Sequence, residues 1–315
     1  MAMPAIPIKR VGRCVADMLA NGRGEVGAVF ERSFYITMDG AWACLLPPRG
    51  GIGPLNAVLS APVPQVLMQQ LRVGQPVVVS DGVIAIGTLR CDFTDAKIWE
   101  PPAPQSWNAT ELARGLAALD ALLARRATPR EGFASLLTNN AAPEGAVAAA
   151  TRGPMQRWQR ALTHAIAEAR MDVDDIEDPQ SLLGLGPGLT PSGDDAIGGA
   201  LIALHALECG ALRDALWRRI KPAAATSTSQ ISFAHLQAAA KGLGHEALHA
   251  TLNSLLRGAA QNLESDIASI DAIGHTSGWD ALAGCVTALK AWLGARTPAV
   301  SDNLSERLRA AVVGS

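Results

Sequence analysis

The feature that most constrains the fold is a change of pattern at the proline-rich segment 101–104. Before it, apolar residues form short runs of alternating or β-branched character, separated by turn dipeptides such as Asp39-Gly40; such runs predict β-strands. After it, apolar residues recur at intervals of three and four, as in an amphipathic helix. A stiff proline-rich linker is typical of a domain boundary. We therefore expect a β-rich domain over residues 1–104 and a helical domain over residues 105–315.

The β-rich half is expected to form a compact, antiparallel, barrel-like unit. Its clearest signal is Ser80-Asp81-Gly82-Val83, because Asp-Gly supplies the positive φ angles of a two-residue hairpin turn. The predicted strands cover residues 25–30, 33–37, 41–46, 76–80, 83–88 and 96–99.

The helical half begins with a predicted capping box, in which Asn108 is followed three residues later by Glu111. Five apolar stripes at helical spacing follow and predict buried helix faces. The stripes are Leu112, Leu116, Leu119 and Leu123; Met155, Trp158, Leu162 and Ile166; Leu212, Leu216 and Ile220; Leu248, Leu252 and Leu255; and Leu282, Val286, Leu289 and Leu293. The predicted fold class is α+β, with a barrel-like unit followed by a mainly helical domain.

Composition excludes several classes of partner. The 315 residues carry a formal net charge of −2 without a basic stripe, which argues against nucleic-acid binding. The longest apolar runs are shorter than the roughly 20 residues that cross a bilayer, and the N-terminus lacks the order of a secretory signal, so we expect a cytoplasmic protein without membrane contact. The five cysteines are widely spaced and form no C-x-x-C motif, which predicts reduced thiols, no metal cluster and no cofactor.

The most unusual segment is the glycine-rich stretch 183–195, Leu-Gly-Leu-Gly-Pro-Gly-Leu-Thr-Pro-Ser-Gly-Asp-Asp, directly before an apolar helix. Backbone N–H groups in such a loop, together with the helix dipole, can bind an anion. The alternative is an ordinary capping box with Ser192 as N-cap and Asp195 at the third helical position. A cap requires neither the glycines nor the second carboxylate, Asp194, so the segment favours ligand binding.

Two further segments also place hydroxyls before a predicted helix: residues 226–232, which are rich in Ser and Thr, and residues 274–280, Gly-His-Thr-Ser-Gly-Trp-Asp. Each could simply cap its helix. Three similar helix starts in one domain nevertheless predict one shared anion pocket. His275 lies in the third segment, where an imidazole could serve as a general acid or base.

A competing pattern is His245-Glu246-Ala247-Leu248-His249, which matches the H-E-x-x-H motif of zinc proteases, with Glu264 as a possible third ligand. Gly242 and Gly244 place this pattern at the start of a helix, which argues against it, and a pattern with three fixed positions also arises by chance in helices that contain His and Glu. We therefore rank a zinc-dependent hydrolase third among the candidate functions.

The glycine-rich stretch 184–195, the Ser/Thr-rich helix start and the segment 274–280 together resemble a bacterial family described as a domain of unknown function. Its members include the third subunit of the oxamate carbamoyltransferase of allantoin catabolism. The resemblance covers most of the helical half, and the β-rich half is similar to the less distinctive first half of the family. It implies a cytosolic transferase subunit in purine degradation that works with two larger protein subunits on carbamoyl phosphate and oxamate or oxalurate.

The family provides no established catalytic residues, so the motifs themselves supply the candidates. His275, Asp194 and Asp195 are the expected catalytic residues. The expected substrate-binding residues are Gly186, Gly188, Thr190, Ser192, Gly193, Thr228, Ser229, Thr276 and Ser277. The alternative to a transferase subunit is a non-catalytic module that binds a small carboxylate or assembles partner subunits.

Overall fold

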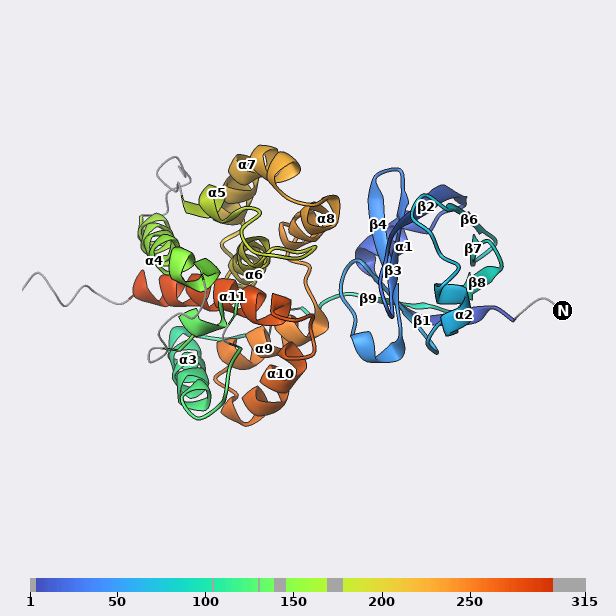
Figure 1. The fold of residues 1–315 in the computed structure, drawn as a ribbon. Coiled ribbons are helices and arrows are strands. Elements are labelled where there is room, and N and C mark those ends of the chain that lie inside the picture. The colour runs from blue at the N-terminus through green and yellow to red at the C-terminus, as the bar shows by residue number, and fades with distance from the viewer. Residues whose placement is uncertain (1–3, 104, 130, 139–145, 169–177, 297–315) are drawn as a thin grey trace, which may run out of the picture.

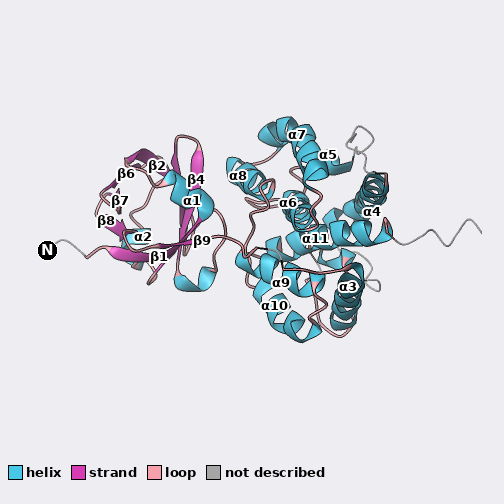
Figure 2. Cartoon of the chain, turned by 180° about the vertical axis from the view of Figure 1, so that it is seen from behind, coloured by secondary structure: helices cyan, strands magenta, loops and turns pink. Residues whose placement is uncertain are grey.

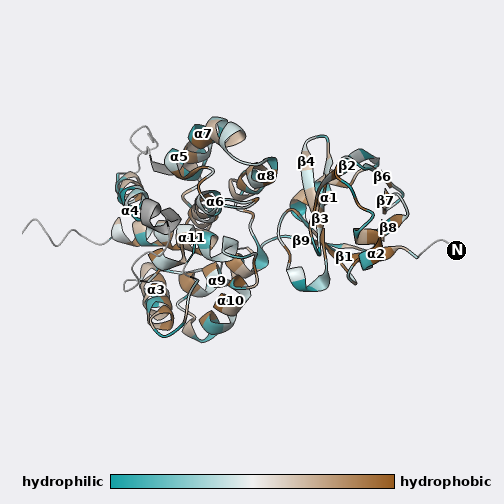
Figure 3. Cartoon of the chain, viewed as in Figure 1, coloured by the Kyte–Doolittle hydropathy of each residue, from teal (hydrophilic) through white to brown (hydrophobic). Residues whose placement is uncertain are grey.

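The structure, a computed structural model, describes residues 4–103, 105–129, 131–138, 146–168 and 178–296 (Figure 1). The first part of the chain forms a β-barrel and the second part forms a body of helices. Figure 2 shows the strands gathered in one body and the longer helices in the other. Each body has its own hydrophobic core, and hydrophobic segments, brown in Figure 3, occur in both. The predicted α+β fold class is confirmed.

Eight strands close the barrel in the order β5-β4-β3-β2-β6-β7-β8-β1, and β1 pairs back onto β5. A ninth strand extends the sheet beside β1. The strands are β1 (Ile6–Gly12), β2 (Gly22–Val29), β3 (Phe34–Met38), β4 (Ala41–Leu46), β5 (Asn56–Leu59), β6 (Pro76–Ser80), β7 (Val83–Ile86), β8 (Leu89–Asp92) and β9 (Lys97–Trp99). Two short helices, α1 (Arg13–Met18) and α2 (Gln65–Met68), and a 3-10 turn, η1 (Pro48–Gly50), belong to the same part of the chain.

The predicted hairpin is confirmed, because β6 and β7 pair antiparallel with Ser80 opposite Val83. Asp81 and Gly82 in its turn have φ angles of +50° and +78°, as Asp-Gly hairpin turns require. The prediction of a wholly antiparallel sheet is wrong, since β1 runs parallel to β8 and β9, and β4 runs parallel to β5. These strand pairs are not joined by tight turns, so no local turn signal sets their direction.

The helices of the second part pack around α6 and α11, which lie in the middle of the helical body in Figure 1. Their bounds are α3 (Ala109–Leu123), α4 (Ala146–Ala167), α5 (Asp178–Leu182), α6 (Ser192–Ala206), α7 (Gly210–Ser227), α8 (Gln230–Ala239), α9 (Glu246–Leu256), α10 (Leu263–Ile270) and α11 (Ser277–Gly294), with 3-10 turns η2 (Ala134–Leu136) and η3 (Ala260–Asn262). The capping box of Asn108 and Glu111 is present as predicted. The five predicted stripes lie in or against one core, with Ile166 and Leu293 partly buried at its edge.

Helices α6 and α11 cross with their backbones in direct contact. A Cβ atom on Gly199 would lie 1.8 Å from the carbonyl oxygen of Ala281, and one on Gly284 would lie 1.7 Å from that of Ala196. No side chain larger than hydrogen fits at either point. This close crossing fixes the starts of the two helices relative to each other, and both starts contribute to the site described below.

Within the described residues, no helix is long and apolar enough to span a bilayer. All five cysteines are free, with Cys44, Cys91 and Cys285 buried. The proposed boundary residue, Pro104, lies outside the described residues, and the division of the chain at that point stays a prediction.

Candidate functional site

A cavity of about 370 Å³ lies between the barrel and the helical body. The barrel contributes Ser33, Tyr35 and Asn56 together with the loop that carries Gly50 and Gly53. The helical body contributes the starts of α6, α9 and α11 and one face of α8. The polar residues on this side are Thr190, Asp194, Asp195, Ser232, His235, His245 and Ser277. All three motifs identified in the sequence therefore line the cavity, through Thr190, Ser232 and Ser277.

The start of α6 differs from the capping box considered above. Its N-cap is Pro191 and no side chain caps it, so the helix begins at Ser192 and the expected register is wrong by one residue. The first amides are also used within the chain, since Gly193 N donates to Leu185 O at 2.9 Å and Asp194 N donates to Pro191 O at 2.9 Å. These N–H groups are therefore not available for an anion.

Asp194 ties together three segments of the helical body. Its carboxylate accepts hydrogen bonds from Gly184 N at 2.8 Å, from Ser232 Oγ at 2.6 Å and from Thr228 Oγ1. The side chain is only 2% exposed. A buried carboxylate with three donors is well satisfied, so Asp194 positions the loop before α6 and the start of α8.

Asp195 is the carboxylate that remains open toward the cavity. Its Oδ2 atom is buried and accepts no hydrogen bond from the described residues. Burial raises the pKa of this carboxyl well above its usual range; the Ser277 and Thr190 hydroxyls oppose the shift, and the negative charges of Asp280 and Asp194 add to it. A carboxyl group in this environment holds a proton at a pH where an exposed aspartate is ionised.

The two hydroxyls beside Asp195 come from different motifs. Thr190 Oγ1 and Ser277 Oγ lie 3.0 Å apart. One of their two protons is used between them, so the other is left for the carboxyl group or for a ligand. The glycine-rich loop and the start of α11 thus converge here, and the start of α8 reaches the same cavity through Ser232, so the three predicted helix starts lie around one cavity.

His275 lies elsewhere. Its side chain is 87% exposed, its Nε2 atom is 3.1 Å from Glu131 Oε2, and it does not line the cavity. Gly274 and Ser277 on either side of it do line the cavity. The segment 274–280 therefore lies at the cavity, as the sequence predicted. The imidazole of His275 points to solvent, however, and does not support an acid–base role at this site.

The other predicted binding residues support the site without lining this cavity. Ser229 is the N-cap of α8 and also donates to Leu189 O at 2.6 Å. Thr276 is the N-cap of α11. Gly186 and Gly188 have φ angles of +116° and +99°, which shape the loop. The residues of this group that do not line the cavity are Gly186, Gly188, Ser192, Gly193, Thr228, Ser229 and Thr276.

Several lining residues have no counterpart in the sequence-based predictions, and two of these are ionisable. His235, on α8, belongs to a helix face that resembled core, and burial lowers its pKa to about 4, so it is neutral at physiological pH. Burial raises the pKa of Tyr35, on β3, and the neighbouring Cys44 and then the negative charge of Asp195 add to the shift. Both reach the site only through tertiary contacts between the barrel, α8 and α6, which no local pattern encodes.

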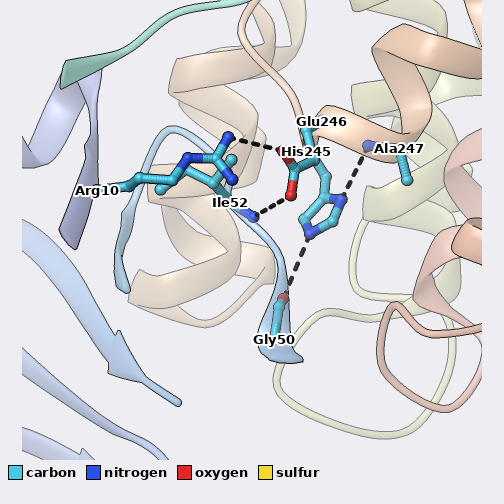
Figure 4. Close-up of polar contacts among 6 residues, drawn as sticks. All are labelled: Arg10, Gly50, Ile52, His245, Glu246 and Ala247. Atoms are coloured by element: carbon cyan, nitrogen blue, oxygen red, sulfur yellow. Dashed lines mark hydrogen bonds and ion pairs between the residues drawn. The ribbon is translucent and has the colours of Figure 1, made fainter. Parts of the chain in front are cut away.

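The H-E-x-x-H pattern forms a contact between the barrel and the helical body (Figure 4). Glu246 accepts from Arg10 Nη2 at 2.7 Å and from Ile52 N at 3.0 Å. His245 is the N-cap of α9, with its Nδ1 accepting from Ala247 N at 3.2 Å, and its Nε2 lies 3.5 Å from Gly50 O.

The second histidine of the pattern is also engaged, since His249 Nε2 accepts from Gly244 N at 3.0 Å. The pattern thus lies at a helix start, as predicted, and its three side chains have structural partners. Among the residues that the structure describes, no group of three or more His, Cys, Asp or Glu is placed to hold a metal ion. This arrangement is not that of a zinc protease.

The fold and the site define a two-part protein that holds a small cavity, lined by both apolar and polar residues, between a closed β-barrel and a helical body. Residues 8–98 match a family described as the AllH family N-terminal domain, and residues 182–289 match one described as oxamate carbamoyltransferase subunit AllH. The chain belongs to the AllH family, and the resemblance inferred from the motifs is confirmed. No curated protein and no solved structure is significantly similar to the chain.

Proposed function

We propose that the chain is a subunit of a cytoplasmic carbamoyltransferase that acts on oxamate or oxalurate and carbamoyl phosphate in allantoin degradation, and that the cavity between barrel and helices holds one of these small substrates. The observation that carries the proposal is that Thr190, Asp195 and Ser277, from two motifs of the matched region, meet in one cavity. The description of the family as an oxamate carbamoyltransferase subunit supports the substrate class and a role beside partner subunits.

The chemistry of the cavity suits a small amide. Carbamoyl transfer to oxamate joins the amide nitrogen to the carbamoyl carbon, releases phosphate and removes a proton from the nitrogen. Asp195 and the two hydroxyls can accept hydrogen bonds from an amide N–H and donate to a carboxylate or carbonyl oxygen. Tyr35 and Asn56 offer further polar groups on the barrel side.

A non-catalytic role in binding or assembly is the alternative. The exposed position of His275 favours this alternative, because the loop then offers the cavity no imidazole for acid–base catalysis. The two possibilities differ in what substitution of a cavity residue does to turnover by the assembled complex.

The test is carbamoyl transfer to oxamate by the chain assembled with its partner subunits. We expect Asp195→Ala to lower kcat/KM by at least about tenfold, the loss of one charged or strongly hydrogen-bonding contact. The matched control is Asp81→Asn, an exposed hairpin position away from the cavity. Assembly and full activity of the Asp195→Ala complex would leave the binding or assembly role as the better account.

A further inference from the structure

We propose that the cavity between barrel and helices is selective for a carboxamide acid with a single negative charge, such as oxamate or oxalurate, and that a phosphate dianion is bound outside this cavity. The inference deepens the proposed function and rests on it for the identity of the ligand. Its basis is the set of charges and hydrogen-bonding groups that line the cavity.

The described residues that line the cavity carry no fixed positive charge. They include no Lys or Arg, and the ionisable side chains among them are Tyr35, Asp194, Asp195, His235 and His245. The nearby guanidinium of Arg10 is paired with Glu246 outside the cavity. A phosphate dianion that entered would lose its hydration without gaining a counter-charge, and that transfer is strongly unfavourable.

The first amides at the start of α6 cannot replace the missing cation, because Gly193 N and Asp194 N already donate within the chain. On α11, Gly278 N donates to Ile273 O at 3.2 Å. The helix starts that the sequence marked as an anion-binding device are therefore largely satisfied. What remains is a set of neutral donors and acceptors.

These neutral groups fit a carboxamide acid. Asp195 Oδ2 is buried and without a partner among the described residues, and the Thr190–Ser277 pair has one hydroxyl proton to spare. His235 lines the cavity and burial lowers its pKa, so the imidazole is neutral and one ring nitrogen can donate while the other accepts. An amide needs both a donor and an acceptor, and the adjoining carboxylate needs donors.

The proton on the Asp195 carboxyl group is the most important hydrogen-bond donor for the carboxylate group of the ligand. Asp194 on α6, Asp280 on α11 and Tyr35 on β3 interact electrostatically with Asp195, and His235 on α8 and His245 at the start of α9 line the same cavity. The carboxylates and the burial favour the protonated form, and an incoming carboxylate favours it further, as in paired carboxyl groups that share one proton. Binding of the acid therefore retains or takes up one proton.

The experiment is isothermal titration calorimetry of the full chain with oxamate and, separately, with inorganic phosphate. Measurements in two buffers of different ionisation enthalpy, between about pH 6 and 8, report the protons exchanged on binding. We expect the affinity for oxamate to fall by up to about tenfold for each unit of rising pH in the range where Asp195 ionises. Phosphate should bind at least about a hundredfold more weakly than oxamate.

Two variants test whether Asp195 binds the ligand as a protonated or as an ionised carboxyl group. Asp195→Asn keeps an N–H donor, so oxamate should still bind, but without the pH dependence. Asp195→Ala should weaken oxamate binding by at least about tenfold, while the control Asp81→Asn should bind normally. An affinity that rises with pH, loss of binding in Asp195→Asn, phosphate binding as tight as that of oxamate, or no oxamate binding at all would each overturn the inference.

The assay of the assembled complex keeps this inference distinct from the proposed function. Carbamoyl transfer to oxamate without these binding signatures would refute the selectivity of the cavity and leave the function intact. Conversely, proton-coupled binding of a different carboxamide acid, such as succinamate, by a complex with no transferase activity would refute the function and support the class of ligand.

Discussion

Asp194 and Asp195 are neighbours in the chain, yet their contacts predict very different effects on stability. Asp194 accepts three hydrogen bonds that join the loop before α6 to the start of α8. A hydrogen bond to a charged group contributes about 1.5–3 kcal/mol, and loss of the acceptor leaves buried donors unsatisfied. Because the freed hydroxyls can find some new partners, the losses do not simply add. We expect Asp194→Ala to lower the free energy of unfolding by about 3–5 kcal/mol, which is at the upper end for a single substitution.

Asp195→Ala should instead change stability by less than about 1 kcal/mol or increase it, because the Oδ2 atom that it removes is buried without a partner. Urea unfolding followed by tryptophan fluorescence measures both variants, and Asp194→Asn serves as the isosteric control with an intermediate loss. The reasoning would be refuted if Asp195→Ala were the more destabilising substitution, the order expected from the capping box with Ser192 as N-cap.

Three further outcomes follow from contacts described above. Gly284→Ala should lower the free energy of unfolding by about 3 kcal/mol or more in thermal melts, since its Cβ would overlap a carbonyl of α6; Gly198→Ala, which meets only an ordinary methyl contact, should not. A double-mutant cycle on Arg10→Ala and Glu246→Ala should give a coupling of about 0.2–1 kcal/mol, because both side chains are more than a third exposed, and a value above about 3 kcal/mol would contradict this. Burial lowers the pKa of His235 from 6.5 to about 4, so the contribution of its neutral form to stability is complete above pH 6.5 and is lost as the pH falls from there to about 4. In this range His235→Gln should reduce the slope of the free energy of unfolding against pH, measured with urea, by up to about 1.4 kcal/mol per pH unit. An unchanged slope would exclude the buried neutral imidazole.

Local signals account for the parts of the fold that were predicted. The Asp81-Gly82 turn and the capping box of Asn108 involve residues within three positions of each other, so their chemistry is visible in the sequence. The strands β1, β5 and β8 were not predicted. Pro7 interrupts the pattern of β1, and β5 and β8 are four residues each; their pairing with distant strands, rather than an alternating pattern, defines them.

The candidate site was predicted in outline and missed in detail for the same reason. The glycine-rich loop and the segment before α11 do converge, but Asp194 is engaged by Thr228 and Ser232, more than thirty positions along the chain, instead of by the start of its own helix. Tyr35 and His235 enter through packing between the barrel and α8. A single sequence shows which residues are available for a site, whereas the partner that each side chain finds depends on tertiary structure.

The backbone contact between α6 and α11 limits how this cavity can change during evolution or engineering. Because glycine is the only residue that fits at the crossing, the wall formed by the two helix starts cannot be moved outward by substituting smaller side chains there. Room for a bulkier ligand has to come from the opposite wall, where Ser33 and Asn56 line the cavity from the barrel. Libraries aimed at new acceptors should therefore vary the barrel side and keep the helical side constant.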